Sequence, residues 1–182
     1  MPAAKRDSNI YTSAMSLAKT ICLDDVQYSA WANQRLLEGC ATLTAEEIER
    51  DLGISHDGIL ATLRHIYDAE RVWFDCLLTN PALGPWWLPQ DPAPELSLDA
   101  LRQAWPEVWD KYRRLMEKWT AADLEVEIIV QLPDGEEPIF PRWKILTHAL
   151  NHSNFHRGQV VGMIRTLGHC PPAINRMDYF LL

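Results

Sequence analysis

The sequence predicts an all-α protein: a four-helix bundle with a long crossover loop and a small β-hairpin excursion before the last long helix. Four long segments have helical periodicity, a proline-rich stretch separates the second from the third, and a β-branched run precedes the fourth. Strands and helices do not alternate, which excludes the parallel-sheet classes. The 182 residues fit one domain. We expect a flexible N-terminal tail over residues 1–15 and a single bundle domain over 16–182.

The first long helix is predicted from Ser16 to Gly39, because glycine is a common residue at the end of a helix. Thr44 and Glu47 have the spacing of a capping box, which begins a short helix. Gly53 is expected to end that short helix.

Ser55 or Asp57 is expected to cap the second long helix, which runs to about residue 79. Residues 80–96 contain five prolines, a density that excludes a helix and predicts the crossover loop. Ser97 then caps the third helix, which runs to about residue 119, and Pro106 is expected to kink it.

Residues 126–141 interrupt the helical pattern with the β-branched run VEIIVQL and the turn signal Pro-Asp-Gly. They predict a small hairpin. The fourth long helix is expected over residues 142–167, with Gly168 as its end. The remaining tail has no regular pattern until its apolar end, which we expect to pack back on the bundle.

Composition excludes several classes of function. The net charge of -8 argues against a nucleic-acid binder that uses a basic face. The N-terminus lacks the apolar stretch of a signal peptide, and no apolar run is long enough to span a membrane. The four cysteines are widely spaced, which favours reduced thiols over a zinc knuckle or redox motif. These features predict a cytoplasmic protein.

Three histidines recur every fourth residue in the last long helix: His148, His152 and His156. Four residues turn an α-helix by about 400°, so these side chains share a narrow stripe. Ile145, Val160 and other apolar residues lie on the same face, so the stripe is buried. Unpaired imidazoles are costly to bury, and a metal ion is a suitable partner.

His65 lies on the apolar face of the second long helix, among small residues that leave space beside its ring. Facing helices of a bundle commonly supply the ligands of one metal ion. The sequence therefore predicts a divalent-metal site formed by His65, His152 and His156. Zinc and nickel are the expected ions, although imidazole also suits iron and copper.

The other histidines have less specific interpretations. His148 is a fourth ligand, a donor behind the ligands or a core residue, and we favour the last two. His56 and His169 flank helix ends, where surface or capping roles are expected. Asp68, Tyr28 and backbone carbonyls are candidate acceptors for the outer nitrogens of the ligands.

Three segments resemble the signature regions of the DinB/YfiT-like family in order and approximate spacing. They are YSAWANQRLL (28–37), ILATLRHIYDAERVWF (59–74) and HALNHSNFHRGQV (148–160). The resemblance implies a four-helix bundle, a divalent metal on His65, His152 and His156, and homodimers. Arg157 and Gln159 belong to the last of these segments, where helix packing or interface contacts are as well supported as catalysis. Trp31 and Asn33, in the first segment, are expected to make contacts in the core and between helices. The loop carrying Trp86 and Trp87 is not part of the signature and is expected to shape a pocket.

Some family members resemble S-transferases that use a low-molecular-weight thiol, and others a thiol-dependent isomerase or hydrolases. A site with three histidine ligands keeps an open position, as catalytic zinc sites do. The leading hypothesis is therefore a thiol-dependent S-transferase that acts on a small electrophile. The alternatives are a metal-dependent hydrolase and a non-enzymatic bundle stabilised by its metal. A DNA-repair polymerase is excluded, because the chain is short, acidic and without a carboxylate cluster for two metals. The sequence assigns no catalytic side chain.

Overall fold

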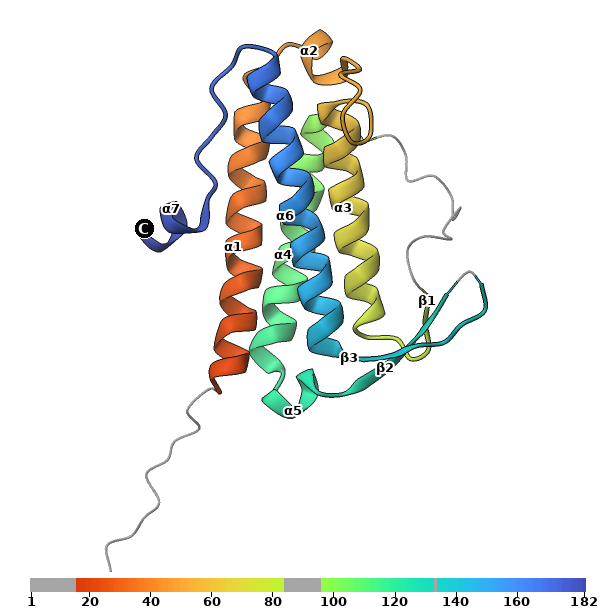
Figure 1. Ribbon diagram of the computed structural model, residues 1–182. Helices are drawn as coiled ribbons and strands as arrows, with labels where there is room; N and C mark the ends of the chain where they lie inside the picture. Colours follow the sequence, from red (N-terminus) through yellow and green to blue (C-terminus); the bar gives the residue numbers. More distant parts are fainter. Residues whose placement is uncertain (1–15, 84–95, 133) are drawn as a thin grey trace, which may run out of the picture.

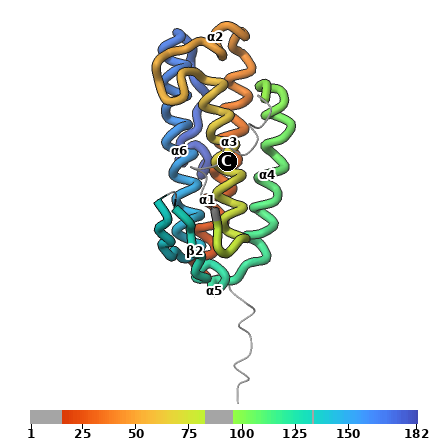
Figure 2. Tube along the Cα trace, turned by 90° about the vertical axis from the view of Figure 1, so that its right-hand side faces the viewer, coloured from red at the N-terminus to blue at the C-terminus, as the bar shows by residue number. Residues whose placement is uncertain are grey.

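The computed structural model describes residues 16–83, 96–132 and 134–182. Four long helices form the bundle shown in Figure 1. They are α1 (Leu17–Cys40), α3 (Ile59–Cys76), α4 (Leu98–Lys118) and α6 (Arg142–Thr166). α6 packs on both α1 and α3, and α4 packs on the same two helices from the other side (Figure 2). The predicted all-α bundle is confirmed.

The helices run in an order that requires a long crossover. In Figure 1, α1 and α6 run upward, while α3 and α4 both run downward. α3 and α4 are thus parallel although they follow one another in sequence, which agrees with a crossover connection. Residues 84–95, with Trp86 and Trp87, lie outside the described residues, as does the predicted tail over 1–15.

Short elements lie at both ends of the bundle and, in the case of the last helix, beside α1 (Figure 1). The predicted hairpin is confirmed as β2 (Glu127–Gln131) paired antiparallel with β3 (Ile139–Pro141). β1 (Ala82–Leu83) adds an unpredicted parallel strand on the free edge of β2. Three short helices complete the fold: α2 (Ala45–Glu49), α5 (Ala121–Leu124) and α7 (Arg176–Phe180). The tail was expected to be irregular, so α7 is a correction.

Several predicted caps are present. Thr44 and Glu47 form the reciprocal capping box of α2, and the Ser97 hydroxyl accepts from the Ala100 N–H at the start of α4. Pro106 lies inside α4, and Gly168 ends α6 with a φ of +87°.

Other predicted helix ends are wrong. α2 already ends at Glu49, before Gly53, and α3 ends at Cys76. The N-cap of α3 is Gly58, not Ser55 or Asp57.

Gly39 is also not a helix stop, because α1 continues through Cys40. A Cβ atom at Gly39 would lie 2.8 Å from Cδ of Pro172, so the glycine allows the C-terminal segment to approach α1. That segment is held along α1 by Tyr28 and Arg35, which donate to the carbonyls of Ile174 and Ala173.

The core consists of two apolar clusters separated by a polar layer. One cluster, around Trp73 and Ile145, fills the end near the hairpin, and the other, around Leu63 and Trp105, fills the opposite end. Between them lie buried polar side chains from three of the long helices: Ser29, Asn33, Glu70, Ser153 and Arg157. In the described part of the chain, no helix is both long and apolar enough to span a membrane.

Candidate metal centre

α3 and α6 bring the three predicted ligands together on one side of the bundle. The Nε2 atoms of His65 and His152 lie 3.1 Å apart. The His156 ring centroid lies 4.5 Å from that of His152 and 4.6 Å from that of His65. His152 and His156 lie four residues apart and therefore on one face of α6, and His65 meets them from the facing helix α3.

The spacing of these nitrogens suits a shared ion. Two imidazole nitrogens at about 2.0–2.1 Å from a tetrahedral zinc are separated by roughly 3.4 Å, close to the distance between His65 and His152. His152 also has a buried Nδ1 atom with no hydrogen-bond partner among the described residues. Uncompensated buried polar atoms are rare and commonly mark functional sites. The donor set and its geometry therefore fit a divalent metal ion.

The protonation state of the cluster also suits metal binding. Burial lowers the pKa of His65 to about 3 and that of His152 to about 4, and the neighbouring histidines contribute to both shifts. Burial lowers the pKa of His156 as well. All three rings are therefore neutral at pH 7 and have a lone pair to donate, as ligation requires.

Gln159 orients the His156 ring. Its Oε1 atom lies 2.6 Å from His156 Nδ1, three residues earlier on α6. With this oxygen as acceptor, Nδ1 carries the proton and Nε2 keeps its lone pair for the cluster. From the sequence, packing, interface contacts and catalysis were all open for Gln159, and this ring-orienting role was not predicted. Its position three residues after a ligand was the available signal, because such side chains are neighbours on a helix.

The acceptors suggested from the sequence have other partners. Tyr28 donates to the carbonyl of Ile174, and Asp68 accepts from Arg71. In the described part of the chain, Gln159 Oε1 and Ser55 Oγ contact a cluster histidine instead, and Ser55 Oγ lies 3.1 Å from His156 Nδ1.

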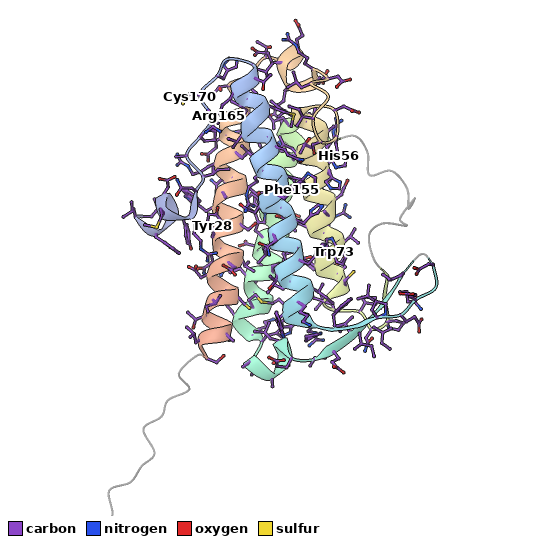
Figure 3. All side chains as sticks on the ribbon, in the orientation of Figure 1. Tyr28, His56, Trp73, Phe155, Arg165 and Cys170 are labelled. Carbon is purple, nitrogen blue, oxygen red and sulfur yellow. The ribbon has the colours of Figure 1, made fainter. Side chains whose placement is uncertain are left out.

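His56 joins the cluster, which the sequence analysis did not predict. It is exposed, as expected, but its ring stacks on His65 with centroids 3.8 Å apart. The ring nitrogens of His56, His65 and His156 include one set in which all lie within 4.8 Å of one another. Figure 3 shows His56 in the loop that precedes α3, beside the upper part of that helix.

The remaining two histidines lie outside the cluster. His148 is exposed, which excludes the core role, and its ring meets Trp73 edge-on at 4.5 Å. Its centroid lies 6.1 Å from that of His152. His169 is a surface residue, as predicted, and its Nε2 lies 2.8 Å from Glu47 Oε1 in the capping box of α2.

Glu70 is a buried carboxylate behind the histidines. It is 2% exposed and accepts four hydrogen bonds from three helices. Asn33 and Ser153 donate to Oε1, while Trp105 and Trp109 donate to Oε2. These bonds satisfy the carboxylate, which a buried charge requires.

Arg157 lies next in the polar layer and is 1% exposed. Its Nη1 atom donates to Ser29 and to Asn33, so Asn33 links Arg157 to Glu70. Asn33 thus makes the predicted contact between helices, and Arg157, for which packing and catalysis were both open, joins α6 to α1. Trp31 is only half-buried, and it contacts the rings of Tyr28 and Tyr179.

Comparison with known proteins gives two matches. The sequence pattern of the DinB family matches residues 15–180. A similar protein is Protein DinB from Bacillus subtilis (strain 168), which is 24% identical over 153 residues. That alignment covers 79% of this chain and 84% of the relative.

Proposed function

Because this chain belongs to the DinB family, we propose that it is a metal-dependent enzyme whose ion is held by His65, His152 and His156. The observation that carries the proposal is the convergence of neutral imidazoles from α3 and α6, with the Nε2 atoms of His65 and His152 3.1 Å apart. Zinc or nickel is the proposed ion, since both accept imidazole ligands.

The reaction we propose is transfer of a small electrophilic group to a low-molecular-weight thiol. The thiol loses its proton to solvent, its sulfur forms the new bond to the electrophile, and the leaving group departs with the bonding electron pair. A bound divalent ion supplies Lewis acidity, which lowers the pKa of a thiol or water that it coordinates.

The chain's own residues hold and orient this centre. His65 and His152 present lone pairs from rigid helices, and Gln159 fixes the tautomer of His156. Three protein ligands leave one position for a cosubstrate, which is the arrangement of catalytic sites. The buried carboxylate of Glu70 is engaged by four donors, so we assign it a structural role and not that of a general base.

Metal content tests the first part of the proposal. The full chain is purified without a metal-affinity tag, and the ions are measured by elemental analysis for wild type, His152→Ala and His169→Ala. His169 is the matched control, because it lies outside the cluster on the surface. We expect about one ion per chain in wild type and His169→Ala, and loss of the ion in His152→Ala.

Thiol dependence tests the second part. The metal-loaded protein is incubated with small electrophiles, with and without low-molecular-weight thiols, and product formation is followed. Product that requires thiol supports the transferase. Product without thiol would overturn it in favour of a hydrolase. A wild-type protein that binds neither zinc nor nickel would overturn the metal site itself.

A further inference from the structure

His56 lies outside the predicted ligand set and yet contacts it. Its ring stacks on His65 at an angle of 30° and lies 5.4 Å, centroid to centroid, from His156. Of the four clustered histidines, it alone lies in a loop, while the other three lie on long helices. A loop residue that reaches a metal centre can move away from it without disturbing the bundle.

The backbone on either side of His56 is in an uncommon conformation. Ser55 and Asp57 have φ values of +58° and +70°, a region that non-glycine residues seldom occupy. Such conformations cost free energy and persist where the surroundings hold them, commonly at functional sites. Here two left-handed residues flank the one loop histidine that faces the cluster.

The loop is tied down at its base. The Leu52 N–H donates to the Asp57 carbonyl at 2.6 Å, which closes a tight turn around His56. Gly58 lies against the start of the loop at the end of α2, because a Cβ atom there would lie 2.7 Å from the Arg50 carbonyl oxygen. These contacts direct consecutive residues toward the cluster, since Ser55 Oγ also lies 3.1 Å from Nδ1 of His156.

We propose that His56 is a fourth, exchangeable ligand of the same ion that His65, His152 and His156 hold. This inference rests on the proposed metal site. One ring nitrogen each of His56, His65 and His156 lies within 4.8 Å of the others, which is close enough for the three to share an ion. Four protein ligands close a zinc site, whereas three leave it open.

The exchange defines how a cosubstrate enters. With an ion bound, His56 would yield its position to an incoming thiol, whose proton would pass to solvent. The loop histidine thus fills the open position in the resting protein, and the three helix histidines keep the ion throughout.

Cobalt substitution of the full-length protein tests the inference. Co²⁺ occupies zinc-type sites, and its visible absorption reports the number and type of its ligands. The spectrum and the Co²⁺ affinity, from competition with a chelator, are measured for wild type, His56→Ala and His169→Ala. His56 is exposed, so its replacement leaves the core intact.

We expect His56→Ala to change the spectrum and to weaken Co²⁺ binding by at least about tenfold, the lower end of what even outer-shell changes cause. Added imidazole should restore the wild-type spectrum in His56→Ala, while His169→Ala should behave as wild type. Equal affinity and equal spectra in wild type and His56→Ala would overturn the inference. That result leaves the proposed site intact, whereas failure of the wild type to bind Co²⁺ would overturn both.

Discussion

Replacement of Gln159 should weaken metal binding without touching a ligand. Its Oε1 accepts from His156 Nδ1 at 2.6 Å, and this bond holds the ring in the tautomer whose Nε2 faces the cluster. In Gln159→Leu the acceptor is lost, and the His156 ring can rotate or change tautomer. His156 is only 8% exposed, so water cannot fully replace the amide oxygen.

The size of the effect follows from the neighbours of Nδ1. Loss of an outer acceptor costs about 10- to 100-fold in metal affinity, or about 1.4–2.7 kcal/mol. Ser55 Oγ lies 3.1 Å from the same Nδ1 and can accept in place of Gln159. We therefore expect Gln159→Leu to lower the metal affinity by about tenfold, and the double variant with Ser55→Ala to lower it by about 100-fold. The effects of the two changes should not add, because Ser55→Ala alone removes only the longer contact. Its effect should be larger when Gln159 is already replaced.

Zinc affinity from chelator competition is the measurement. Gln159→Glu keeps an acceptor at the same position and should bind zinc at least as tightly as wild type. Gln34→Leu is the matched control, since Gln34 is an exposed helical glutamine that donates to Glu38. Unchanged affinity in Gln159→Leu, or an equal loss in Gln34→Leu, would refute the assigned role.

Three further predictions concern the metal-free protein. The folded pKa of His65, about 3, lies below its ordinary value, so the unfolded chain alone takes up this proton as the pH falls through about 6.5. The free energy of unfolding, measured by urea titration, should therefore fall from pH 7 to pH 4. The fall should be less steep in His65→Ala, and an equal dependence on pH in the two proteins would contradict this prediction. Glu70→Ala removes the acceptor of four donors, three of them buried, and should lower the free energy of unfolding by about 3–5 kcal/mol. A loss below about 1 kcal/mol would mean that the polar layer is dispensable. Gly39→Ala places a Cβ 2.8 Å from Pro172 and should lower the free energy of unfolding by about 1–3 kcal/mol. Gly158→Ala places a Cβ that meets nothing within 4 Å, so this variant should be as stable as wild type or more stable. Equal unfolding midpoints for these two alanine variants would show that the C-terminal segment yields freely.

Features that depend on residues close together in the sequence could be predicted. The capping box at Thr44, the serine cap of α4 and the glycine end of α6 depend on residues a few positions apart, and all three are present. The bundle and its crossover follow from helical periodicity and proline density. The convergence of His65 with the histidines of α6 also follows, because each lies on the apolar face of a long helix.

Features that depend on contacts distant in sequence could not be predicted. Gly39 has the composition signal of a helix end, but its role is set by Pro172, more than a hundred positions later. β1 pairs in parallel with β2 across the whole of α4. His56 reaches the cluster through left-handed Ser55 and Asp57, for which neither residue type gives a strong signal.

The polar layer explains why the two halves of the candidate site stay in register. Glu70 lies five residues after His65 on α3, and its Oε1 accepts from Ser153, which directly follows His152 on α6. An apolar contact tolerates a small shift of one helix along the other, whereas this bond does not, because a shift would remove one of the four donors of a buried carboxylate. Asn33 ties the same oxygen to α1, so three helices are fixed at the level of the histidines. Ligand nitrogens must hold their positions within a few tenths of an ångström to share an ion, and this layer supplies the rigidity that the apolar clusters do not.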